Sequence, residues 1–174
     1  MTREQLEHAI RAACDVVDDH EVYVFGSQSI LGQFPEVPPM LKMSAEADIS
    51  PRNRLDRVEH LNAIGEDSPF HLAHGFYVHG LPIHEAATLP TGWEERTIVV
   101  RATENATGLC LEGHDLGASK LVAFRDKDRE FVLTLLAEGF LSSTILVERI
   151  WCLPVSQTDR ERIARWVHLS IQEL

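Results

Sequence analysis

Apolar residues recur three or four positions apart near the start of the chain, at Leu6, Ile10, Ala13 and Val17. This spacing predicts an amphipathic helix that packs on a core. Thr2 followed three residues later by Gln5 is typical of a capping box, which places the start of the helix close to residue 3.

A short run of β-branched and aromatic residues follows, from Glu21 to Phe25, and stops abruptly at Gly26-Ser27. Apolar spacing resumes at Ile30, so the pattern predicts a strand, a tight turn and a helix. Prolines predict a loop over residues 33–43, and a second strand is expected over residues 45–50.

The middle of the chain mixes both periodicities. Residues 54–64 suit a helix whose inward positions are Leu55, Val58, Leu61 and Ala63. Residues 70–83 alternate loosely, residues 97–102 form a further predicted strand, and residues 109–111 close the β-rich part.

Strong helix formers dominate from His114 onward. Four helices are expected, over residues 115–124, 128–137, 143–151 and 156–173, the last capped by Ser156 and Asp159. The pattern as a whole predicts an α/β (α+β) protein with a mixed-sheet core over residues 1–112 and a helical C-terminal subdomain over residues 113–174.

Composition narrows the class of protein. The formal net charge of −11 argues against a protein that binds nucleic acid through broad phosphate neutralisation, so any such contact is expected to be local. The three cysteines form no CxxC pair, and no stretch has the length of a membrane-spanning helix. We therefore expect a cytoplasmic protein without a membrane partner.

The first candidate for chemistry is the Gly26-Ser27 turn, where a predicted strand passes into a helix. Backbone N–H groups at such a point, together with the helix dipole, favour an anion such as a phosphate. Gly26 permits close approach, and Ser27 and Ser29 add hydroxyl donors. An ordinary surface turn has the same pattern.

The second candidate is a pair of acids, Glu46 and Asp48, two residues apart on a predicted strand. Alternating side chains place both carboxylates on one face, where they can share hard divalent cations such as Mg²⁺ or Mn²⁺. An acidic edge strand that faces water is the alternative.

The third candidate is the charged segment around Lys120. Lys120 and Arg125 can reach toward a triphosphate, and Asp128 can orient Lys120 or help activate an acceptor hydroxyl. A pair of helices joined by surface ion pairs would have the same composition.

Three motifs occur in order at residues 24–29 (VFGSQS), 44–49 (SAEADI) and 115–128 (DLGASKLVAFRDKD). Together they resemble the polymerase-β-like nucleotidyltransferase superfamily, in particular bacterial nucleotidyltransferase-like proteins related to the AbiEii and MenT toxins. The segments LPTGW at residues 89–93 and Cys110-Leu111 are also similar, and the resemblance covers residues 20–140.

The resemblance implies that the Gly-Ser turn and Lys120 hold a nucleoside triphosphate and that Glu46 and Asp48 hold the metal. Asp128 would match the acid of the Lys-Asp motif. It also implies transfer of a nucleotide to an RNA, including the tRNA acceptor end, or to a protein, and neutralisation by an antitoxin partner. Gly26, Ser27, Glu46, Asp48 and Lys120 are expected to converge around one cleft.

Two other classes of protein remain open. The chain has no obvious third metal-binding aspartate, so a catalytically idle binding or assembly protein with this fold is the main alternative. A zinc hydrolase built on His71, His74, His79 and His84 beside Glu85 fits no known ligand spacing. His71 and His74 are expected in a strand or loop, where residues three apart need not share a face, and we predict no zinc bound by these histidines.

Overall fold

The computed structural model describes residues 1–172, which form two compact units. The first unit contains Met1–Ala86 and Thr97–Leu111, and the second contains Ala87–Arg96 and the chain from Glu112 onward. The predicted boundary lies at residue 112, but Ala87–Arg96 belongs to the second unit.

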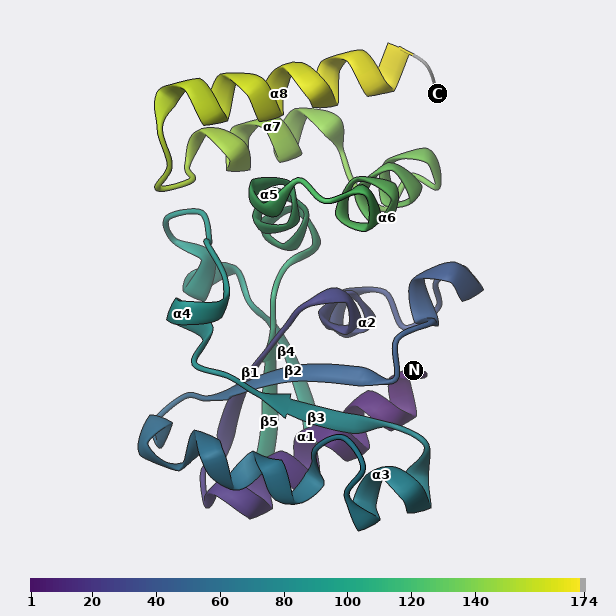
Figure 1. Cartoon of the computed structure of the whole chain (residues 1–174), viewed down its shortest axis with the longest axis vertical. Helices are drawn as coiled ribbons and strands as arrows, with labels where there is room; N and C mark the ends of the chain where they lie inside the picture. The colour runs from purple at the N-terminus through teal and green to yellow at the C-terminus, as the bar shows by residue number, and fades with distance from the viewer. Residues whose placement is uncertain (173–174) are drawn as a thin grey trace. The chain divides into compact units, whose positions relative to one another are not determined.

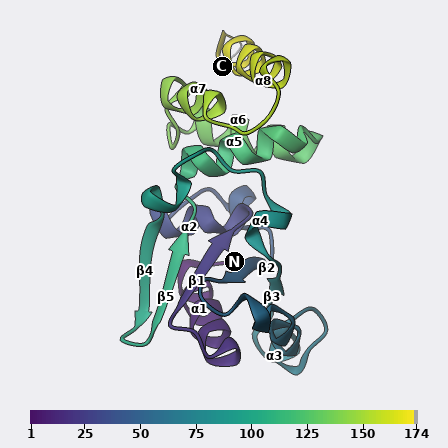
Figure 2. The ribbon, with the colours of Figure 1, turned by 90° about the vertical axis from the view of Figure 1, so that its left-hand side faces the viewer.

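The first unit is built on a five-stranded mixed sheet in the order β3-β2-β1-β5-β4. The strands are β1 Glu21–Phe25, β2 Glu46–Pro51, β3 Tyr77–Gly80, β4 Ile98–Thr103 and β5 Ala106–Cys110. The central β1 is antiparallel to β2 and parallel to β5. Figure 2 shows the antiparallel β4–β5 hairpin along one edge. The sheet and the helices confirm the predicted α+β class.

Helix α1 (Arg3–Val17) packs on one face of this sheet, and the structure confirms its capping box at Thr2 and Gln5. Gly108 of β5 permits this packing, because a Cβ atom there would lie 2.4 Å from Cδ1 of Ile10. The apolar face of α1 is therefore held directly against the sheet, as Figure 1 shows for the purple helix.

The segment Leu55–Ile64 (η3) packs beside α1 and β3 as a 3₁₀ helix and not as the predicted α-helix. Three residues per turn align Leu61 and Ile64, which are buried. The prediction that Leu55 and Ala63 point inward is wrong, because both are exposed. The tighter helical period explains the difference.

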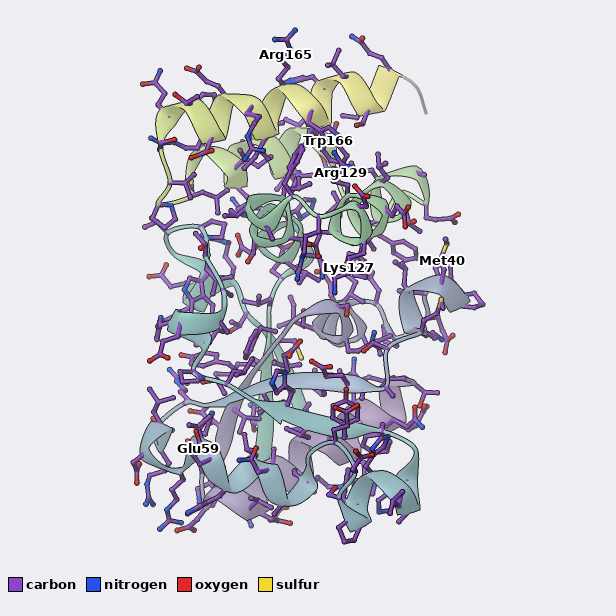
Figure 3. The ribbon with its side chains drawn as sticks, in the orientation of Figure 1. Met40, Glu59, Lys127, Arg129, Arg165 and Trp166 are labelled. Atoms are coloured by element: carbon purple, nitrogen blue, oxygen red, sulfur yellow. The ribbon has the colours of Figure 1, made fainter. Side chains whose placement is uncertain are left out.

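The remaining elements of the first unit are short. They are the 3₁₀ turns η1 (Ser27–Ser29) and η2 (Pro39–Lys42) and the helices α2 (Ile30–Gln33), α3 (Pro69–His74) and α4 (Ile83–Ala86). The predicted proline-rich loop thus contains only one 3₁₀ turn, on which Met40 is 60% exposed (Figure 3).

The second unit contains the helices α5 (Gly113–Ala123), α6 (Asp126–Ala137), α7 (Ser143–Trp151) and α8 (Gln157–Gln172). The Asp159 amide donates to Ser156 Oγ at 3.1 Å, which confirms the predicted cap. The predicted end of this helix at residue 173 lies outside the described residues. On α8, Trp166 points toward the other helices, whereas Arg165 points away (Figure 3).

Their common core consists of Ala118, Leu121, Val132, Leu146, Ile150, Leu153, Ile163, Ala164 and Val167. The segment Ala87–Arg96, which ends in the 3₁₀ turn η4 (Trp93–Arg96), is tied to these helices by an ion pair. Arg96 Nε donates to Oδ2 of the fully buried Asp115 at 2.8 Å. The LPTGW segment is thus a structural part of the helical unit.

No helix within residues 1–172 combines the length and the apolar character needed to cross a membrane.

Candidate metal centre

The acidic pair lies on the face of β2 opposite α1. Ala47 and Ile49 are fully buried on the α1 side, so strand alternation turns Glu46 and Asp48 to the other face. The side chains of Glu46 and Asp48 are 33% and 22% exposed. Both carboxylates are therefore accessible but partly withdrawn from water.

Strand β3 adds two further polar side chains to this face. In the parallel β2–β3 register, Tyr77 lies opposite Glu46 and His79 lies opposite Asp48. The Tyr77 hydroxyl donates to Glu46 Oε2 at 2.9 Å. His79 Nδ1 lies 3.0 Å from Glu46 Oε1 and 3.2 Å from Asp48 Oδ1.

Glu46, Asp48 and His79 could together hold a metal ion, because one ligand atom from each lies within 4.8 Å of the other two. Within residues 1–172 this is the one such group of three acidic, histidine or cysteine side chains. The imidazole ring and the two carboxylates converge on one point of the sheet face.

The Gly26-Ser27 turn directly adjoins this cluster. Gly26 follows β1 with a φ of 72° and a ψ of −173°, a conformation open essentially to glycine alone. A Cβ atom at Gly26 would lie 1.9 Å from Asp48 Oδ2. The missing side chain therefore makes room for the Asp48 carboxylate, which places the predicted phosphate turn and the acidic pair side by side.

Ser29 has a structural role in this turn. Its buried hydroxyl donates to the Gly26 carbonyl at 2.9 Å. Ser27 is half-buried. The following helix α2 has only four residues, so a helix dipole contributes little to anion binding here. Backbone N–H groups and the Ser27 hydroxyl remain the donors that a phosphate could use.

The two carboxylates differ in acidity. The pKa of Asp48 is raised to about 7 by burial and by the neighbouring Glu46, against the opposing effect of His79. Burial also raises the pKa of Glu46, but hydrogen bonds with Asp48, Tyr77 and His79 outweigh it and leave this pKa below its usual value. The pair therefore favours one retained proton, and a bound cation would offset both the burial of charge and the repulsion between the carboxylates that retain this proton.

The predicted cations form a separate cluster inside the second unit. Asp128 is 1% exposed and accepts from Arg125 Nε at 2.6 Å, with Lys120 Nζ at 3.5 Å. Lys120 also lies 4.8 Å from the centre of the Phe131 ring. Asp128 thus contacts both Lys120 and Arg125, and its two predicted roles stay predictions. The convergence of Lys120 on Asp48 stays a prediction.

Sequence reasoning overlooked His79 as a partner of the acidic pair. A signal existed, since Tyr77 and His79 are spaced two apart on a short strand, as Glu46 and Asp48 are. The strand pairing that joins the two sets is long-range and was not predicted. His71 and His74 lie in α3, not in the strand or loop expected for them.

His71 Nδ1 accepts the Asp67 amide at 3.0 Å, and His74 packs 4.5 Å from the ring of His8. The His71 ring also lies 4.8 Å from the ring of Tyr77, whose hydroxyl donates to Glu46, whereas His74 packs on the rings of His8 and Phe70. A comparison with family models, curated proteins and solved structures found no match for this chain.

Proposed function

We propose that this chain is a metal-dependent nucleotidyltransferase, which transfers a nucleotide from a nucleoside triphosphate to an acceptor hydroxyl. The observation that carries the proposal is the contact between Gly26 and the Asp48 carboxylate. This contact places a turn with hydrogen-bond donors for a phosphate beside a pair of carboxylates suited to a divalent ion.

Each group then has a stated role. Glu46 and Asp48 would hold Mg²⁺ or Mn²⁺, which when bound would stabilise the charge that develops on the transferring phosphoryl group. The Ser27 hydroxyl and the backbone amides of the turn would bind the phosphates. Lys120, held by Asp128, would supply a positive charge to the triphosphate, with Arg125 beside it.

The acceptor that we propose is an RNA, including the tRNA acceptor end, or a protein. The acceptor hydroxyl loses its proton to solvent, and its oxygen forms a bond to the α-phosphorus. The bond from that phosphorus to the bridging oxygen breaks, and pyrophosphate leaves. The resemblance of the three motifs supports the further proposal of a toxin that an antitoxin protein neutralises. The three free cysteines support a reducing, cytoplasmic setting.

The test measures transfer of α-labelled nucleoside triphosphates to RNA and protein in the presence of Mg²⁺ or Mn²⁺. The parent should label an acceptor and Asp48→Ala should not, although its melting temperature stays near that of the parent. Stability should be kept because a partly exposed carboxylate beside a like charge contributes little to packing. Asp15→Ala, an exposed acid on α1, is the matched control and should retain transfer.

The binding-protein alternative predicts a different result. Such a protein would bind the metal–nucleotide complex without transferring it, and parent and Asp48→Ala would then label acceptors equally poorly. Equal and substantial labelling by both proteins would show that the acidic pair has no part in the reaction.

A further inference from the structure

His79 contributes the one nitrogen donor to the acidic cluster in the described part of the chain. Its side chain is 50% exposed, so core packing does not explain the position of the ring. The contacts that fix it are those of Nδ1 with Glu46 Oε1 and Asp48 Oδ1. The ring is therefore directed at the point where the two carboxylates meet.

The geometry of these contacts fits shared coordination of one ion. An octahedral ion with ligands at about 2.1 Å places neighbouring ligand atoms about 3 Å apart. The distances from His79 Nδ1 to the two carboxylate oxygens are 3.0 and 3.2 Å. The imidazole nitrogen and either carboxylate can thus occupy adjacent positions around one ion with little movement.

Strand pairing makes this placement specific. His79 lies directly opposite Asp48 in the parallel register, so the two side chains leave the sheet side by side. The next residue of the same face, Tyr77, donates its hydroxyl to Glu46 Oε2. This bond leaves Glu46 Oε1 turned toward His79, as their 3.0 Å separation requires.

We propose that His79 is a metal ligand and that it makes this centre select a divalent first-row transition ion, with Mn²⁺ as the probe, over Mg²⁺. Mg²⁺ is a hard cation that prefers oxygen ligands, whereas imidazole nitrogen suits transition ions. The inference rests on the metal site of the proposed function, but it does not depend on nucleotide transfer.

Two substitutions at residue 79 replace the nitrogen ligand by other atoms that occupy nearly the same place. In Asp and in Asn, the terminal side-chain atoms are attached to Cγ, as Nδ1 is in histidine, so they can take nearly the same place. His79→Asp supplies a charged oxygen ligand, and His79→Asn supplies a neutral amide that keeps hydrogen bonds to the carboxylates. His20→Asn is the matched control, because His20 is exposed, contacts the Asn105 carbonyl and precedes β1 at the end away from Asp48.

The experiment titrates the full chain with Mn²⁺ and with Mg²⁺ by calorimetry, without nucleotide. It also records the pulsed electron paramagnetic resonance of bound Mn²⁺, which detects coupling to a ligand ¹⁴N nucleus. The parent and His20→Asn should bind Mn²⁺ about tenfold or more tightly than Mg²⁺ and show nitrogen coupling. His79→Asp should lose the ¹⁴N coupling of bound Mn²⁺ and reduce the ratio of Mn²⁺ affinity to Mg²⁺ affinity. His79→Asn should weaken Mn²⁺ binding about tenfold.

The inference is overturned if the parent binds neither ion, or if His79→Asn retains both the nitrogen coupling and the parental Mn²⁺ affinity. An unchanged Mn²⁺ to Mg²⁺ ratio in His79→Asp would also overturn it. Nitrogen-coupled Mn²⁺ in a parent that transfers no nucleotide would contradict the proposed function alone and leave the assignment of His79 intact.

Discussion

At the scale of single residues, the candidate centre depends on a glycine as much as on its acids. Gly26 supplies a backbone conformation that other residues avoid and leaves the space that the Asp48 carboxylate fills. Gly75 has the same φ of 72°, but a Cβ atom at this residue would have no neighbouring atom within 4 Å. Substitution of the two glycines by alanine therefore distinguishes the effect of backbone strain, which both share, from the effect of filling the space beside Asp48, which only Gly26 has.

Gly26→Ala is expected to destabilise the protein and to weaken divalent metal binding, because the new methyl group displaces the Asp48 carboxylate. Gly75→Ala should cost only the strain of a left-handed backbone, about 1–2 kcal/mol, and should leave metal affinity unchanged. Urea denaturation and metal titration of both variants test this. Parental metal affinity in Gly26→Ala would show that the contact does not position Asp48.

The raised pKa of Asp48 predicts how stability depends on pH in the metal-free protein. Between the usual value of 3.8 and the folded value of about 7, the folded state retains a proton that the unfolded chain releases. The contribution of Asp48 to the free energy of unfolding therefore falls as pH rises through this window. The lowered pKa of Glu46 acts in the opposite direction, chiefly at lower pH.

Asp48→Asn removes this titration, so the variant should gain stability relative to the parent as pH rises from about 5 to about 8. Urea denaturation with a chelator present measures the difference at each pH. A stability difference that stays constant over this range would mean that Asp48 ionises in the folded protein as it does in the unfolded chain.

At the scale of elements, the helical unit depends on acids that are buried against cations. On α6, Asp128 is 1% exposed and bound to Arg125 and Lys120, whereas Asp126 is 86% exposed and bound to Arg129. The two acids lie on one helix two residues apart. A comparison of them therefore measures how burial changes the contribution of an ion pair to stability.

Asp128→Asn is expected to cost about 1–3 kcal/mol of stability, because it leaves partly buried donors without their charged acceptor. Asp126→Asn should cost less than about 0.5 kcal/mol, since an exposed ion pair is screened by water. Chemical denaturation of the two variants compares these costs. Equal costs would show that the buried cluster adds nothing to the fold of the helical unit.

At the scale of the whole molecule, the proposed reaction gives Asp48 and Lys120 different roles. Lys120→Ala should weaken binding of a nucleoside triphosphate and leave the affinity for the free metal ion unchanged, because the carboxylates stay in place. Asp48→Ala should instead lose the affinity for the free metal ion. Calorimetric titration with metal alone and then with nucleotide separates the two defects. If both variants bind metal–nucleotide as the parent does, neither residue belongs to the site.

Much of the fold followed from local pattern. The first helix, the strand that ends at Gly26 and the four C-terminal helices were predicted close to their observed bounds, because capping and periodicity are encoded within a few residues. The segment Leu55–Ile64 was predicted as the wrong kind of helix. Its apolar spacing suits a three-residue period as well as a longer one, and packing on α1 and β3 accompanies the shorter period.

The sequence by itself determined that Glu46 and Asp48 share one face, since the alternation of a strand is a local property. It also placed a glycine turn directly after the preceding strand. Only the tertiary structure decided that Gly26 meets Asp48 and that β3 brings His79 to the same point. Strand order and register join residues that are distant in the chain, and they depend on how the whole sheet packs, which no local pattern records.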